Sequence, residues 1–65
     1  MQAECVTNSC NNTNFTVGQI YEMTETGIRT NWGNMWTSFK DWDKPHSFAK
    51  GTIFKFGMCE FIIKS

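Results

Sequence analysis

The stretch of sequence that decides the fold is Thr52-Ile53-Phe54-Lys55-Phe56-Gly57-Met58-Cys59-Glu60-Phe61-Ile62-Ile63. Apolar residues recur at every second position in its last part, where Cys59, Phe61 and Ile63 share one face. A period of two is typical of a half-buried β-strand. A helix is disfavoured, because the stretch is short, rich in β-branched residues and interrupted by Gly57. The pattern therefore predicts two strands, one on each side of this glycine.

Towards the N-terminus, short segments rich in β-branched and aromatic residues alternate with turns that contain Gly, Asn or Ser. The expected strands cover residues 3–7, 15–24, 28–32, 35–39, 52–56 and 58–63. The residues expected to share a face within them are Val17, Tyr21 and Met23, then Ile28, Thr30 and Trp32, and then Met35, Thr37 and Phe39. A two-residue hairpin turn is expected at Gly33-Asn34. We interpret the whole as an all-β fold, a small five-stranded antiparallel barrel.

The chain has 65 residues, of which 40% are hydrophobic, and six Lys plus Arg balance six Asp plus Glu. This length predicts a single domain, residues 1–65, and the apolar content excludes intrinsic disorder. Zero net charge argues against a strongly basic nucleic-acid binder or an acidic DNA mimic, since each depends on a field of one sign. Neither a run of ~20 apolar residues nor a signal peptide is recognisable, so we expect no membrane association.

Three cysteines, Cys5, Cys10 and Cys59, are candidate zinc ligands together with His46. A strong zinc signature has two closely spaced ligand pairs, whereas this chain has one, formed by Cys5 and Cys10. The favoured interpretation is that Cys5 and Cys59 are small core residues and Cys10 is a loop thiol. We therefore expect no metal and no cofactor. An odd number of cysteines without a secretion signal fits reduced thiols in a cytosol, which leaves the glycosylation sequon at residues 11–13 without weight.

Side chains suited to catalysis are few in this sequence. Nucleophilic catalysis requires a Ser or Cys beside a base, and the single histidine, His46, follows Pro45 in a loop. Asp41 and Asp43 are available as an acid–base pair, but carboxylates two residues apart in a loop more often cap a turn. The sequence also lacks a Gly-rich phosphate-binding loop. We expect a non-enzymatic protein.

Aromatic residues are concentrated between residues 32 and 48, a stretch that holds all three tryptophans. A domain this small cannot bury every ring, and tryptophans are enriched at binding hot spots. Alternation turns Trp36 outward and Trp42 lies in a polar loop, so both favour an interface. For Trp32, an interface and a cover over an open end of the barrel are equal alternatives. The candidate partner-binding residues are Trp32, Trp36, Lys40, Trp42, His46 and Phe48.

Two motifs stand in the first third of the chain, Cys5-Val6-x-Asn8 and Phe15-Thr16-Val17-Gly18-Gln19-Ile20-Tyr21-Glu22-Met23. With these motifs the chain resembles a family of small phage-encoded proteins. The resemblance is close over residues 5–23, loose over 27–37 and absent over 40–56. It implies a phage origin and an SH3-like five-stranded barrel whose first and last strands are neighbours. It carries no catalytic residue.

Three functions are compatible with these features. The first is a phage accessory protein of the host cytoplasm that binds a host protein machine (a defence system, nuclease or polymerase) and inhibits or redirects it. The second is binding of single-stranded nucleic acid by base stacking on exposed aromatics, although zero net charge counts against it. The third is a nucleotide pocket that requires oligomerisation. The expected partner is a host protein, and a second copy of the chain is the alternative. Nucleic acid is less favoured, and no membrane is expected. The basic residues available for the second function are Arg29, Lys40, Lys44 and Lys50.

Overall fold

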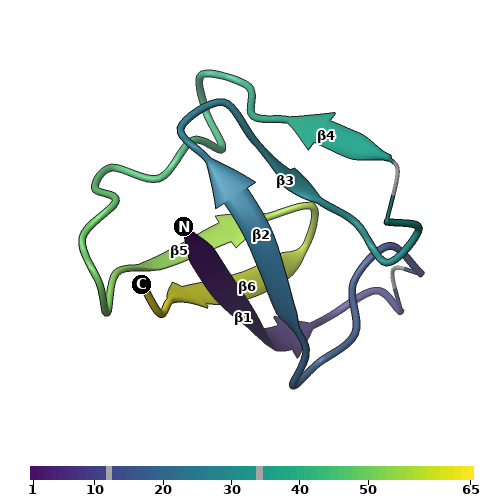
Figure 1. The fold of residues 1–65 in the computed structure, drawn as a ribbon. Coiled ribbons are helices and arrows are strands. Elements are labelled where there is room, and N and C mark those ends of the chain that lie inside the picture. Colours follow the sequence, from purple (N-terminus) through teal and green to yellow (C-terminus); the bar gives the residue numbers. More distant parts are fainter. Residues whose placement is uncertain (12, 34) are drawn as a thin grey trace.

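The computed structural model describes residues 1–11, 13–33 and 35–65, which form one six-stranded antiparallel sheet (Figure 1). The strand order is β4-β3-β2-β1-β6-β5, and the sheet curls into a half-barrel. Among the described residues there is no helix, and so none long and apolar enough to cross a membrane. The strands are β1 (Gln2–Asn8), β2 (Ile20–Thr24), β3 (Gly27–Arg29), β4 (Trp36–Ser38), β5 (Ile53–Phe56) and β6 (Cys59–Ile63). The predicted all-β antiparallel architecture is confirmed.

The predicted number of five strands is wrong, because each of the six alternating segments forms a strand of its own. The two strands expected on either side of Gly57 are confirmed as β5 and β6. β1 lies between β2 and β6, so the first and last strands are neighbours, as expected. The hairpin turn expected at Gly33-Asn34 and the sequon at residues 11–13 each include a residue outside the described ranges.

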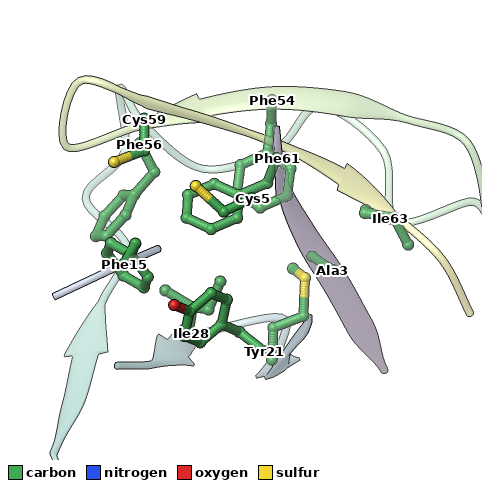
Figure 2. Close-up of a cluster of buried hydrophobic side chains, with 11 residues drawn as sticks. Ala3, Cys5, Phe15, Tyr21, Ile28, Phe54, Phe56, Cys59, Phe61 and Ile63 are labelled. Carbon is green, nitrogen blue, oxygen red and sulfur yellow. The ribbon is translucent and has the colours of Figure 1, made fainter. Parts of the chain in front are cut away.

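The core lies inside the curve of the sheet and is dominated by aromatic rings (Figure 2). Phe61 of β6 stacks on Phe54 of β5 with 5.3 Å between ring centroids, and Phe15 meets Phe61 edge-on at 5.0 Å. Tyr21 of β2 packs edge-on against Phe15 at 5.2 Å. Edge-on and offset arrangements are those that aromatic quadrupoles favour. The buried hydrophobic residues are Ala3, Cys5, Phe15, Tyr21, Met23, Ile28, Phe54, Phe56, Cys59, Phe61 and Ile63, which confirms the predicted inner face of β6.

Only the second half of the second predicted strand forms, and its expected inward face is partly wrong. Tyr21 and Met23 are buried, as predicted, whereas Val17 is exposed and Phe15 is buried in its place. The N–H of Gln19 donates to the carbonyl of residue 16 at 3.1 Å, so the chain turns before β2 begins. A turn resets the alternation of side chains, and the period of two therefore does not extend back to Val17.

β3 and β4 are shorter than expected and end before the tip of their hairpin. Ile28 and Thr30 are buried as predicted, and Phe39 packs half-buried against the core. Trp32 and Met35 do not share the burial of the other residues on their expected faces, since both side chains are more than half exposed. They lie beyond the paired residues of the two strands, where the sheet no longer covers them.

Candidate partner-binding surface

The largest exposed apolar side chains of the sheet gather on the β3–β4 hairpin, at one end of the strand order. Trp32 is 59% exposed, Met35 56% and Trp36 40%. Arg29 on β3 lies directly opposite Trp36 in the antiparallel register. We call Arg29, Trp32, Met35 and Trp36 together the hairpin surface. Single exposed apolar residues are normal on a protein, whereas contiguous apolar patches are typical of contact sites. Three large exposed apolar side chains on one hairpin make it the candidate contact site of the sheet.

Trp36 is held in place by the two residues that its ring covers. The Arg29 guanidinium carbon lies 5.9 Å from the centroid of the Trp36 ring, a cation–π contact. On the same face, the indole lies so close to Gly27 that a Cβ added there would collide with its Nε1 atom. This explains why Gly27 is buried at the start of a strand and why no larger residue fits. The ring is therefore partly exposed and also fixed in orientation.

Trp32 is tethered through its ring nitrogen. Its Nε1–H donates to the Asn14 side-chain oxygen at 3.1 Å, and the N–H of Asn31 donates to the Asn14 carbonyl at 2.7 Å. The Asn31 side-chain oxygen accepts from the Tyr21 hydroxyl at 2.5 Å, while its amide donates to the Thr16 hydroxyl at 3.0 Å. Tyr21 is a core residue, so this network ties the tip of the hairpin to the interior.

Trp42 lies at the other end of β4 and is 83% exposed, more than any other large apolar side chain described. The N–H of Phe39 donates to the Thr26 carbonyl at 2.9 Å, which places the following turn beside the β2–β3 turn. Within that turn the Asp43 carboxylate accepts from the Lys40 N–H at 2.5 Å. Asp43 therefore caps the turn that presents Trp42, which is the structural role that carboxylates in a loop commonly take.

The structure divides the predicted site residues among three environments. Trp32 and Trp36 belong to the hairpin surface, whereas Lys40 and Trp42 belong to the turn after β4. His46 is exposed in the long connection to β5. Phe48 lies in the same connection but is half-buried and packs against the core, so it is mainly a structural residue.

Sequence reasoning missed Met35, which it grouped with Thr37 and Phe39 on one face of a strand. The signal that marks it as exposed is the run of turn-forming residues before it, because a tight turn ends the regular alternation early. The contribution of Gly27 was also missed. Its close approach to Trp36 depends on the pairing register of β3 with β4, and no spacing within the chain reveals that register.

The cysteines behave as core and loop residues. Cys5 and Cys59 are buried, and burial raises the pKa of both thiols, that of Cys59 to about 11. Each thiol also interacts with the other, so the two sulfur atoms are neighbours inside the core. Cys10 is exposed, 4.0 Å from the Gly57 carbonyl. Within the described ranges, no three His, Cys, Asp or Glu side chains are placed to hold a metal ion, and no pocket is formed.

Comparisons of the chain with protein-family models, curated proteins and solved structures give no significant match. We therefore infer the function from the surface itself. Two tryptophans are fixed by their own contacts on one hairpin, and a capped turn presents a third.

Proposed function

We propose that the chain is a non-enzymatic binding protein that recognises another protein through the hairpin surface, with Trp42 as a second contact. The observation that supports this is the exposure of Trp32, Met35 and Trp36 on one hairpin. Tryptophan carries a large apolar area on few rotatable bonds and dominates many binding hot spots. An uncovered group of this kind favours association with a partner.

The fixed orientation of both hairpin tryptophans supports the same proposal. Binding normally costs free energy because mobile side chains must be immobilised. Here Trp36 is held by Arg29 and Gly27, and Trp32 is held by its hydrogen bond to Asn14. Most of that ordering has already occurred in the folded chain. A partner therefore meets a preorganised apolar surface, which favours tight recognition.

The resemblance over residues 5–23 to small phage-encoded proteins with an SH3-like barrel supports a more specific form of the proposal. In that form the chain is a phage accessory protein that acts in the host cytoplasm. Its partner is a host protein machine such as a defence system, a nuclease or a polymerase, which it inhibits or redirects. The half-barrel of short antiparallel strands is compatible with this family.

A single-stranded nucleic acid is the second candidate partner. The observation that favours it is the Arg29–Trp36 pair, since an aromatic ring beside a cation is a platform on which bases stack. Zero net charge weakens this candidate, because nucleic-acid affinity comes largely from contacts with phosphates. A salt titration of binding to a short oligonucleotide separates the two candidates, since only phosphate contacts produce a steep loss of affinity as salt rises.

The main test is capture of partners from a bacterial host lysate by tagged variants. Trp36→Ala removes a ring that contributes little to the core, and we expect the captured partner to bind about 30-fold more weakly, or about 2 kcal/mol. Trp42→Ala should keep the melting temperature and also weaken capture. The matched control is Ile53→Ala, since Ile53 is 57% exposed but lies on β5. Equal capture by all three variants and the parent chain would contradict the proposal.

A further inference from the structure

We propose that the free edge of β4 binds an extended segment of the partner, which joins the sheet as an additional strand beside Trp36. This inference rests on the proposed function and makes it more specific, because it states the conformation of the bound segment and the backbone atoms that hold it. Three features support it, namely the direction of the backbone groups of β4, the difference between the two edges of the sheet, and the side chains that flank the edge.

Two hydrogen bonds at the ends of the β3–β4 hairpin show which residues of β4 bond to β3 and which direct their backbone groups away from it. The N–H of Thr30 donates to the Met35 carbonyl at 3.4 Å, and the N–H of Phe39 donates to the Thr26 carbonyl at 2.9 Å. In an antiparallel pair, residues that bond to the neighbouring strand alternate with residues that do not. Thr37 therefore bonds to β3, while the residues on either side of it direct their backbone groups away from β3.

Trp36 and Ser38 are the two residues that face outward. Each presents one N–H and one C=O on the side of β4 where no further strand lies (Figure 1). Within the described part of the chain, these outward groups have no hydrogen-bond partner, and both residues are exposed. A row of outward donors and acceptors at this spacing matches the edge of another extended strand.

The two edges of the sheet are chemically different. At the β5 edge the N–H of Ile63 donates to the Thr52 carbonyl at 2.9 Å, so Ile53 and Lys55 face away from β6. Lysine on an edge strand is a common obstacle to strand addition, because a new strand must cover its charge. β4 consists of Trp36, Thr37 and Ser38 and has no charged residue. The β4 edge is therefore the one open to a partner.

Apolar side chains flank this edge. Trp36 lies against Gly27 on one face of the sheet, and Met35, the residue before β4, is also exposed. A partner residue opposite Trp36 would exchange hydrogen bonds with its backbone and place its own side chain against the indole. The preferred segment is thus extended, with an apolar residue at that position.

The test uses a yeast-displayed library of random 12-residue peptides, selected against the full chain. The selected peptide is then synthesised and its affinity is measured for the parent chain and for two proline variants. Ser38→Pro removes an outward N–H that the fold does not use and places a ring in the path of an added strand. Lys55→Pro makes the same change at the β5 edge and is the matched control. Thermal melts followed by circular dichroism report whether each variant is folded.

We expect Ser38→Pro to bind the selected peptide at least 10-fold more weakly, and Lys55→Pro to bind it within 2-fold of the parent chain. A second measurement uses the unaltered chain, so it does not depend on how the variants fold. Methylation of single backbone nitrogens in the peptide should reduce affinity at alternate positions only. Equal affinity for Ser38→Pro, or insensitivity to every methylation, would overturn strand addition, as would a selection that enriches no binding peptide.

The outcome also separates this inference from the proposed function. If Trp36→Ala weakens binding of the captured host protein while Ser38→Pro does not, the hairpin surface binds a partner without strand addition, and only the inference fails. If neither of these variants nor Trp42→Ala weakens it, the proposed function fails as well. If the chain alone sediments as a dimer that Ser38→Pro dissociates, the occupant of the edge is a second copy, which also overturns the inference.

Discussion

Gly27 shows how much one missing side chain contributes to this surface. Replacing glycine with alanine in a strand usually stabilises a protein slightly, because the unfolded chain loses freedom. Here the added methyl would collide with the Trp36 indole and press on the Thr37 carbonyl. We therefore expect Gly27→Ala to lower the free energy of unfolding by about 1–3 kcal/mol, the usual cost of overpacking. Urea denaturation measures this change.

The same residue offers an internal control. In a Trp36→Ala background the indole is absent, so Gly27→Ala should cost less than it does in the parent chain. The cost should not vanish, because the backbone carbonyl of Thr37 stays in place. The difference between the two costs is the coupling between residues 27 and 36. A coupling of zero would show that the indole moves aside freely, and would remove the argument that Trp36 is preorganised.

At the scale of elements, the β5–β6 hairpin contains a residue in an unfavourable conformation. Gly57 and Met58 form its turn with φ of 59° and 66°, and only glycine adopts such values without cost. Met58 is about half exposed, so little packing is lost when it is replaced. We expect Met58→Asn to raise the free energy of unfolding by about 0.5–1 kcal/mol, since asparagine tolerates this region better. Met58→Val should lower it, and a urea denaturation in which both variants have equal stability would contradict the prediction.

The elements also show what could be predicted from the sequence. Alternation alone identified β6 and the inner face of β2, because each is a run in which every second residue is buried. It failed at Val17, Trp32 and Met35, since strand ends are set by turns and by pairing with other strands. For the site, local pattern was enough to place Trp36 outward and Trp42 in an exposed loop. The contacts that fix Trp32 and Trp36 join distant segments, and no local pattern encodes them.

At the scale of the whole molecule, the raised pKa values of the Cys5 and Cys59 thiols make the free energy of unfolding depend on pH. The folded chain holds the pKa of Cys59 at about 11, mainly because burial disfavours the thiolate, against an ordinary value of 9.0. Between these values the unfolded chain loses a proton that the folded chain keeps. The free energy of unfolding should therefore fall as pH rises from about 9 to about 11, by up to about 1.4 kcal/mol per pH unit. Below pH 9 the Cys59 thiol is protonated in both the folded and the unfolded chain, so the free energy of unfolding keeps its full value there.

Cys59→Ala isolates that effect from the other groups that titrate at high pH. The variant is expected to be less stable at pH 7, because the core loses a buried side chain, but its stability should decline less steeply above pH 9. Urea denaturation at several pH values measures both slopes. Identical slopes for the variant and the parent chain would show that the Cys59 thiol does not ionise on unfolding in this range.

The unequal edges of the half-barrel have a consequence for growth into polymers. A sheet protein forms open fibres when the edge of one molecule joins a different, compatible edge of the next, since such contacts repeat without closing. Here Lys55 obstructs the β5 edge, while β4 itself contains no charged residue. A contact between the β4 edge of one copy and the β5 edge of the next is therefore disfavoured, because it would have to cover the Lys55 charge. One charged residue on β5 thus opposes head-to-tail growth of the protein into an open fibre.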